Sequence, residues 1–319
     1  MKNFLNPASR QTLHTCLSLS LRHRRPLRRA GKSLTRYCYY LFLLPALLGS
    51  CWREPVPDGP VDDTPTVPAV DSVLTTVRLD AGGREVHALD LFIYASGGIR
   101  GLEHHIHLDH LPDELCIRTP PGEKLLAAIA NSPRSFNLKA LERYDAMEQL
   151  SFSFADDDPD APILGGSGAT QELTGTVSLA PLLCRVVLAS VSNTMDGYEL
   201  LENPRIRLRD LPAGAEILRR KDFRPTELLD AGPWAALPYD IGYFPQEPRV
   251  TLWCYPNDTP EDILGVPRPT LEFACEIRGN ACSFDIPLPP LARGATVEVG
   301  LTVDGPDDYS VPEMKVTAP

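Results

Sequence analysis

The sequence predicts an all-β protein of two β-sandwich domains in tandem, with one or two short helices. Short segments in which apolar and polar residues alternate recur from residue 74 to residue 304. Turn-forming residues separate these segments at the spacing typical of β-sandwiches. Only residues 137–150 have a convincing helical pattern. We expect an N-terminal domain over residues 73–230 and a C-terminal domain over residues 231–319.

The first 50 residues have the features of a secretory signal. They hold nine Lys and Arg residues and no Asp or Glu, followed by an apolar run from Tyr39 to Leu48. This run is too short to span a bilayer, which takes about 20 residues. Leu48-Gly49-Ser50-Cys51 resembles a lipobox, so we expect removal of residues 1–50 and lipidation of Cys51, with palmitate among its acyl chains. An ordinary signal peptide with a nearby cysteine is the alternative.

The chain after residue 50 is strongly acidic. It keeps 22 of the 31 basic residues and all 42 acidic ones, a net charge of −20. Such a surface disfavours nucleic acid and electrostatic adhesion to anionic lipid. Residues 51–72 hold five prolines among polar residues, which predicts an extended tether.

The expected elements follow in chain order. Strands 74–80 and 86–95 are joined by a turn at residues 81–84, and 124–131 is an apolar strand buried on both faces. The helix over 137–150 has Asn137 as its N-cap. Further strands are expected at 150–155, 174–180, 182–192, 249–256, 270–277, 281–288 and 295–304.

Residues 103–110, "EHHIHLDH", are the sharpest candidate for chemistry. His105, His107 and Asp109 would share one strand face and are ligand types that zinc accepts. Ligands spaced in this way span about 13 Å along a strand, too far for one tetrahedral ion. We therefore expect no metal site, and interpret the segment as a solvated strand with Ile106 and Leu108 packed inward.

The other motifs do not predict catalysis. "GGSGA" at 165–169 is close to a nucleophile elbow but lacks the helix that should follow, so we expect a flexible loop. The acidic stretch 156–160 lacks the spacing of a calcium-binding EF-hand. We expect a protein that is not an enzyme and needs no cofactor.

Five cysteines remain besides Cys51, so at least one is unpaired within the chain. Cys275 and Cys282 could face each other across a hairpin that turns at residues 278–280, which makes them a candidate disulfide.

Several short segments, which follow one another in a fixed order, resemble the fimbrillin superfamily of type V pili, and within it the FimB-type fimbrial anchor subunits. They are the lipobox, "VHALDLFIYASGG", "LLAAIANSP", "LKALERYDAMEQL", "LLCRVVLASVSN", "VTLWCYPND" and "FDIPLPPLARGATVEVGLTV". The resemblance implies two transthyretin-like sandwiches and a surface-exposed, lipid-anchored protein of the cell outer membrane. It also implies partner fimbrial subunits that join by β-strand exchange or domain docking, after a protease trims the first strand of polymerising subunits.

The expected function is a non-catalytic, cell-adhesion-related subunit that anchors a fimbrium and docks its first shaft subunit. The alternatives are a shaft or tip subunit, or a surface lipoprotein that binds glycan or metal through residues 103–110. The candidate donor strand is the tail, in which Met314 and Val316 alternate with polar residues. If the tail is the donor, deleting residues 309–319 should leave a folded protein. The tail could instead fold back as an edge strand of its own domain.

Overall fold

The computed structural model describes residues 72–197, 199–218, 227–258 and 268–318. The expected signal, Cys51 and nearly all of the tether lie outside these residues. In the described part of the chain no helix is both long enough and apolar enough to cross a membrane.

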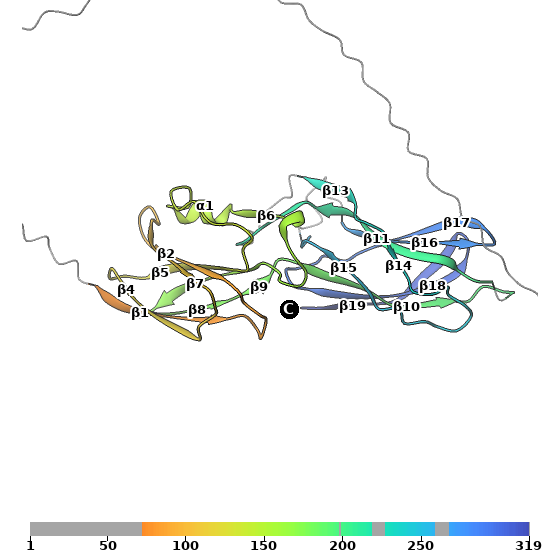
Figure 1. Cartoon of the computed structure of the whole chain (residues 1–319), viewed down its shortest axis with the longest axis horizontal. Helices are drawn as coiled ribbons and strands as arrows, with labels where there is room; N and C mark the ends of the chain where they lie inside the picture. Colours follow the sequence, from red (N-terminus) through yellow and green to blue (C-terminus); the bar gives the residue numbers. More distant parts are fainter. Residues whose placement is uncertain (1–71, 198, 219–226, 259–267, 319) are drawn as a thin grey trace, which may run out of the picture. The chain divides into compact units, whose positions relative to one another are not determined.

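The N-terminal sandwich consists of two sheets that share one long strand (Figure 1). The strand order is β3-β2-β5-β7-β8-β1-β4, and β7 pairs with β5 along its first part and with β8 at its end. The strands are β1 (Val73–Asp80), β2 (Leu89–Ala95), β3 (Leu102–Leu108), β4 (Glu114–Thr119), β5 (Lys124–Ala130), β7 (Leu164–Gln171), β8 (Thr174–Ser178) and β9 (Ala180–Pro181), which pairs with β7.

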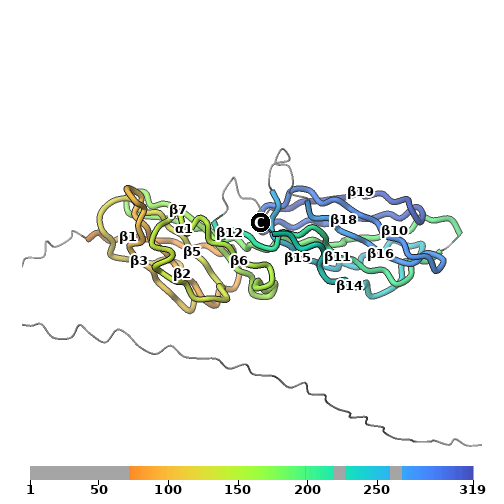
Figure 2. Tube along the Cα trace, turned by 90° about the horizontal axis from the view of Figure 1, so that it is seen from above, coloured from red at the N-terminus to blue at the C-terminus, as the bar shows by residue number. Residues whose placement is uncertain are grey.

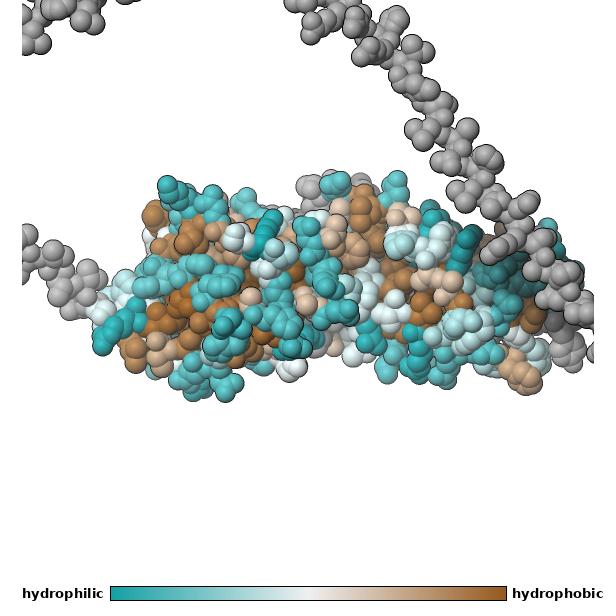
Figure 3. Space-filling model, viewed as in Figure 1, coloured by the Kyte–Doolittle hydropathy of each residue, from teal (hydrophilic) through white to brown (hydrophobic). Residues whose placement is uncertain are grey.

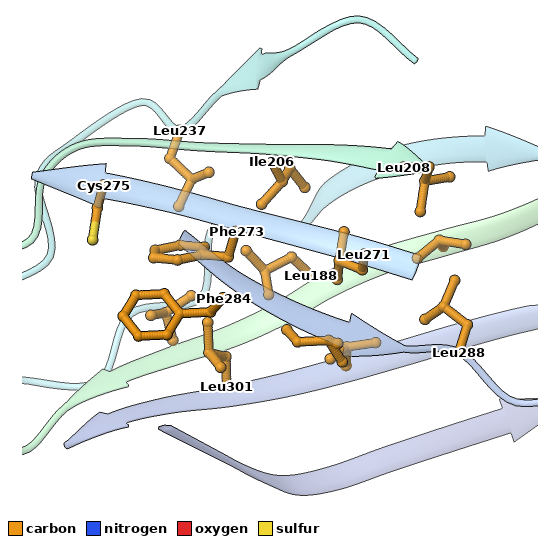
Figure 4. Packing of buried hydrophobic residues seen from close by; sticks show 14 of the residues in the cluster. Leu188, Ile206, Leu208, Leu237, Leu271, Phe273, Cys275, Phe284, Leu288 and Leu301 are labelled. Atoms are coloured by element: carbon orange, nitrogen blue, oxygen red, sulfur yellow. The ribbon is translucent and has the colours of Figure 1, made fainter. Parts of the chain in front are cut away.

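The C-terminal sandwich also has two sheets, with orders β15-β10-β18-β19 and β13-β11-β16-β17. Its strands are β10 (Cys184–Asn193), β11 (Glu202–Pro212), β13 (Leu228–Ala231), β14 (Ala235–Ala236, paired with β11), β15 (Val250–Cys254), β16 (Thr270–Ile277), β17 (Asn280–Pro287), β18 (Thr296–Gly305) and β19 (Asp308–Thr317). Side chains from both sheets meet in one apolar core, among them Leu188, Phe273, Phe284 and Leu301 (Figure 4). The expected all-β class is thus confirmed.

Strand pairing divides the chain differently from the expected boundary at 230/231. In Figure 2 the green β10 runs beside the blue β18, and the two strands pair in parallel. β11 pairs with β16, so two strands whose residues were assigned to the first domain complete the second. No strand was expected over the residues of β11. The chain then returns to the first sandwich, where β12 (Gly214–Glu216) pairs with β6 (Ser151–Ser153) and Ala215 joins the apolar cluster. The N-terminal sandwich therefore uses residues 73–183 together with the segment around β12.

The expected helix is much shorter than predicted. The helix α1 spans Tyr144–Glu148, and η1 (Phe154–Asp156) is a single 3₁₀ turn. Asn137 does cap a turn, because its side-chain oxygen accepts a hydrogen bond from the Lys139 amide at 3.1 Å. The turn does not continue as a helix, and the buried Leu141, Tyr144 and Met147 fix the segment on the core instead.

The segment "GGSGA" is a strand and not the loop expected from its glycines. It forms most of β7 between β5 and β8. A Cβ at Gly166 would lie 2.3 Å from the Ser178 carbonyl oxygen, and one at Gly165 would lie 2.5 Å from the Ile217 side chain. These glycines let neighbouring backbones approach closely.

The turn at residues 81–84 forms, with the Arg84 amide bonded to the Ala81 carbonyl at 3.2 Å. It does not make a hairpin, because β1 pairs with β4 and β8 whereas β2 pairs with β3 and β5. The turn therefore carries the chain from one sheet of the sandwich to the other.

Candidate assembly surfaces

The first strand, β1, is an interior strand of its sheet. It pairs antiparallel with β4, from Val73 opposite Thr119 to Arg78 opposite Glu114, and parallel with β8 on its other side. Val77 is fully buried and Leu79 nearly so, in a cluster with Val177 of β8. Removing β1 would leave an apolar groove between two strands whose backbone groups had lost their partners.

Polar contacts fix the register of β1. The hydroxyls of Thr75 and Thr119 are hydrogen-bonded at 2.7 Å in the buried interior. On the exposed face the Arg78 Nε donates to Glu114 Oε2 at 3.3 Å. The Asp80 side chain accepts the Gly82 amide at 2.8 Å, which shapes the turn that ends the strand.

The C-terminal tail is the edge strand β19, which was the alternative left open by the sequence. Met314 lies opposite Val299 and Val316 opposite Val297 of β18. Val316 is 47% exposed, whereas Met314 packs partly against the core. The register shifts between Gly300 and Thr302, opposite the part of the tail that holds Pro312, as expected for a residue that cannot donate to the ladder.

The histidine strand is organised around a residue that the sequence did not suggest. His105 Nε2 lies 2.8 Å and His107 Nδ1 lies 3.0 Å from the same carboxylate oxygen of Asp90, on the neighbouring strand β2. Asp90 is 6% exposed, and the His105 ring also contacts the Phe92 ring, with centroids 4.7 Å apart. Both histidines therefore donate hydrogen bonds to a buried carboxylate. We had expected only a solvated strand. The feature of the sequence that could have indicated this arrangement was the single Asp inside the apolar run of β2.

Asp109 does not join this cluster. It lies beyond the end of β3 and contacts His110 at 2.9 Å, and the hydrogen bond to His110 holds the pKa of Asp109 below its usual value. Within the described ranges no group of three or more His, Cys, Asp or Glu side chains could hold a metal ion.

Cys275 and Cys282 lie directly opposite each other in the hairpin of β16 and β17, as their spacing suggested. Burial raises the pKa of Cys275 to about 12. All five cysteines of the described chain carry free thiols in the structure.

Apolar side chains also reach the surface. On the face shown in Figure 3 apolar patches lie between hydrophilic residues. Among the most exposed are Ile99, at 73%, and Phe244, at 76%, whose ring packs edge-on against Tyr243.

No family model matches the chain, and no curated protein matches it. Solved structures do. A candidate cell adhesion protein from Parabacteroides distasonis ATCC 8503 superimposes with a TM-score of 0.57 at 10% identity, over 78% of this chain and 96% of that one. A fimbrilin from Porphyromonas gingivalis W83 gives a TM-score of 0.52 at 9% identity, over 74% and 90%. The chain has the fimbrillin fold.

A second candidate cell adhesion protein with the fimbrillin fold, from Bacteroides eggerthii DSM 20697, gives a TM-score of 0.53 at 12% identity, over 77% and 94%. The fimbrillin fold of this chain covers both sandwiches, because the shared region spans about three quarters of its length and nearly all of each neighbour.

Proposed function

We propose that this protein is a non-catalytic structural subunit of a surface fimbrium and forms its lipid-anchored base in the outer membrane. The fold it shares with a fimbrilin and with candidate cell adhesion proteins supports the subunit role. The lipobox-like sequence before Cys51 supports the anchor role. In this proposal the lipid on Cys51 holds the base, and the sandwiches dock the first shaft subunit.

The lipobox-like sequence before Cys51 is the observation that carries the anchor proposal, and the position of β1 indicates how an anchor would transmit force. β1 follows the tether directly and is hydrogen-bonded on both sides, to β4 and to β8. A force that pulls on the fimbrium would act on the hydrogen bonds along both sides of β1 at the same time. The strand would therefore connect the lipid firmly to the folded domain. An intact β1 also keeps the groove of this subunit filled.

The alternative is a shaft or tip subunit, from which β1 is removed. Two basic residues, Arg78 and Arg84, are candidate positions for the cut that would remove β1. Arg78 lies within β1, so a cut after it would leave Leu79 and Asp80 in place. Arg84 lies in the turn after β1, so a cut after it would release the whole strand. A shaft role thus predicts a mature N-terminus at Glu85, whereas an anchor keeps Cys51.

We place the contact with the first shaft subunit at β19, the edge of the C-terminal sandwich. One side of β19 pairs with β18, and the strand order places no other strand on its second side in the described chain. A partner strand could extend the sheet there by main-chain hydrogen bonds. Acting as a donor would first require β19 to leave β18.

The test compares Cys51→Ser with the matched variant Cys116→Ser. Cys116 is exposed on β4 and has no place in the proposal. Wild type and Cys116→Ser should remain in the membrane fraction with a lipidated N-terminal Cys51 and retain fimbriae on the cell. Cys51→Ser should leave the membrane and shed fimbriae into the medium.

Two results would contradict the proposal. One is a Cys51→Ser protein that partitions into detergent as wild type does. The other is a surface protein whose N-terminus lies between residues 79 and 85, which would assign the chain to the shaft or tip.

A further inference from the structure

Four of the five described cysteines form two directly opposed pairs across neighbouring strands of the C-terminal sandwich. Cys275 lies opposite Cys282, and Cys184, the first residue of β10, lies opposite Cys254, the last residue of β15. Cys116 stands apart on β4 of the other sandwich, opposite a threonine. The spacing of 70 positions between Cys184 and Cys254 gave no hint of the second pair in the sequence.

We propose that Cys184 and Cys254 form a disulfide in the exported protein. Directly opposed residues of an antiparallel pair have Cα atoms about 4.5 to 5.5 Å apart. Disulfides accept Cα separations of about 4.4 to 6.8 Å, so directly opposed cysteines lie within the range that a disulfide spans. Both side chains are fully buried.

The surroundings of the two thiols support the pair. A hydrogen bond that the Cys254 thiol donates to the Cys184 sulfur, together with burial, raises the pKa of Cys254 well above its usual value. Because the two residues are directly opposed, their side chains lie on the same face of the sheet. In the reduced state the Cys184 thiol donates a hydrogen bond to the Ala292 carbonyl oxygen at 3.0 Å, and formation of the disulfide would replace this bond.

The chemistry is thiol–disulfide exchange with a disulfide-bearing protein or small molecule as oxidant. The thiolate of one cysteine attacks the oxidant disulfide and forms a mixed disulfide, and one thiol of the oxidant leaves. The second cysteine then attacks its partner's sulfur and releases the other thiol. Two protons and two electrons pass from the cysteine pair to the oxidant. Because the thiolate is disfavoured in the buried site, we expect the bond to form before folding is complete.

The bond would fix an edge of the sheet. β15 is the outermost strand in the order β15-β10-β18-β19, and edge strands are the easiest to detach. A link between the start of β10 and the end of β15 would close a loop of more than 60 residues and hold the edge strand in place. This inference needs export to an oxidising compartment but does not depend on the fimbrial role.

The decisive measurement maps thiols in the exported wild-type protein. Cells are quenched in acid, the protein is denatured without reductant and alkylated, and its peptides are analysed by mass spectrometry. The expected result is a peptide pair joined through Cys184 and Cys254, with Cys116 alkylated. Alkylation of both Cys184 and Cys254, or a link from either one to another cysteine, would overturn the proposal.

A second measurement shows what the bond does and uses the variant Cys275→Ala/Cys282→Ala, so that the other pair cannot contribute. Reducing this protein in the unfolded state and refolding it with reductant should lower its Tm by more than about 5 °C. The matched protein with Cys184→Ala and Cys254→Ala added should show no change with reductant. If the variants fail to fold, the thiol map of the wild type still decides.

Discussion

The N-terminal sandwich should depend on β1 for its stability, and a peptide should be able to replace the strand. The perturbation is a chain that begins at Gly82 and so lacks β1. Burial of one Val or Leu side chain stabilises a fold by about 1.5 to 3 kcal/mol, so Val77 and Leu79 together contribute about 3 to 6 kcal/mol. The buried Thr75–Thr119 hydrogen bond adds about 1 kcal/mol. Since domains are stable by only about 5 to 15 kcal/mol, this loss is a large share of the total.

The assay is calorimetry of the shortened chain with and without a synthetic peptide of residues 72–81. The shortened chain should lose the transition of its N-terminal sandwich or show it at a much lower temperature. The wild-type peptide should restore that transition. A peptide with Val77→Asp should fail, because it would bury a charge, whereas a control peptide with Arg78→Ser should succeed, because Arg78 is exposed.

Two outcomes would refute this reasoning. If the shortened chain melts like the full one, β1 is not a structural strand of the sandwich. If the Val77→Asp peptide restores stability as well as the wild-type peptide does, the inward face of β1 does not decide binding.

Four further predictions concern the described residues. Replacing His105 and His107 with Thr should lower the free energy of unfolding by about 1 to 3 kcal/mol, because Asp90 would keep a buried carboxylate without these donors. A chelator should leave the Tm of the wild type unchanged, and a large drop would reveal a metal site. Deleting residues 309–319 should destabilise the C-terminal sandwich, since β19 packs on its core, and a deleted protein as stable as wild type would contradict this. Burial raises the pKa of Asp157 from 3.8 to about 6, so the carboxyl stabilises the fold when protonated, and this contribution is lost as the pH rises through about 6. The Tm of Asp157→Asn relative to wild type should therefore be higher at pH 7.5 than at pH 4.5, and an equal difference at both values would contradict the assignment.

The deletion prediction reverses what the sequence suggested. The alternation of Met314 and Val316 correctly indicated a strand, but it could not show where that strand pairs. In the structure Tyr309, Val311 and Met314 pack against the apolar core, so the tail is part of the domain. The sequence could not reveal the partner of the histidines for the same reason. Asp90 becomes their neighbour only when β2 pairs with β3.

The sequence by itself located the strands whose apolar and polar residues alternate, among them β1, β10 and β17. Alternation with a period of two set the inner and outer faces of β1 and β17, and the turn residues at 278–280 set the hairpin that brings Cys275 opposite Cys282. These features depend on residues close together in the chain, so local patterns can specify them. The acidic composition after residue 50 is likewise a property of the sequence alone.

Only the tertiary structure decided which strands lie side by side. β1 pairs with β8, almost one hundred positions away, and β10 pairs with β18 of the second sandwich. It also decided that the glycines of β7 form a strand and that Cys184 meets Cys254. A strand's alternation fixes the face that it buries, but its backbone N–H and C=O groups are the same in every strand. The partner is therefore chosen by how all the buried faces fit together in three dimensions.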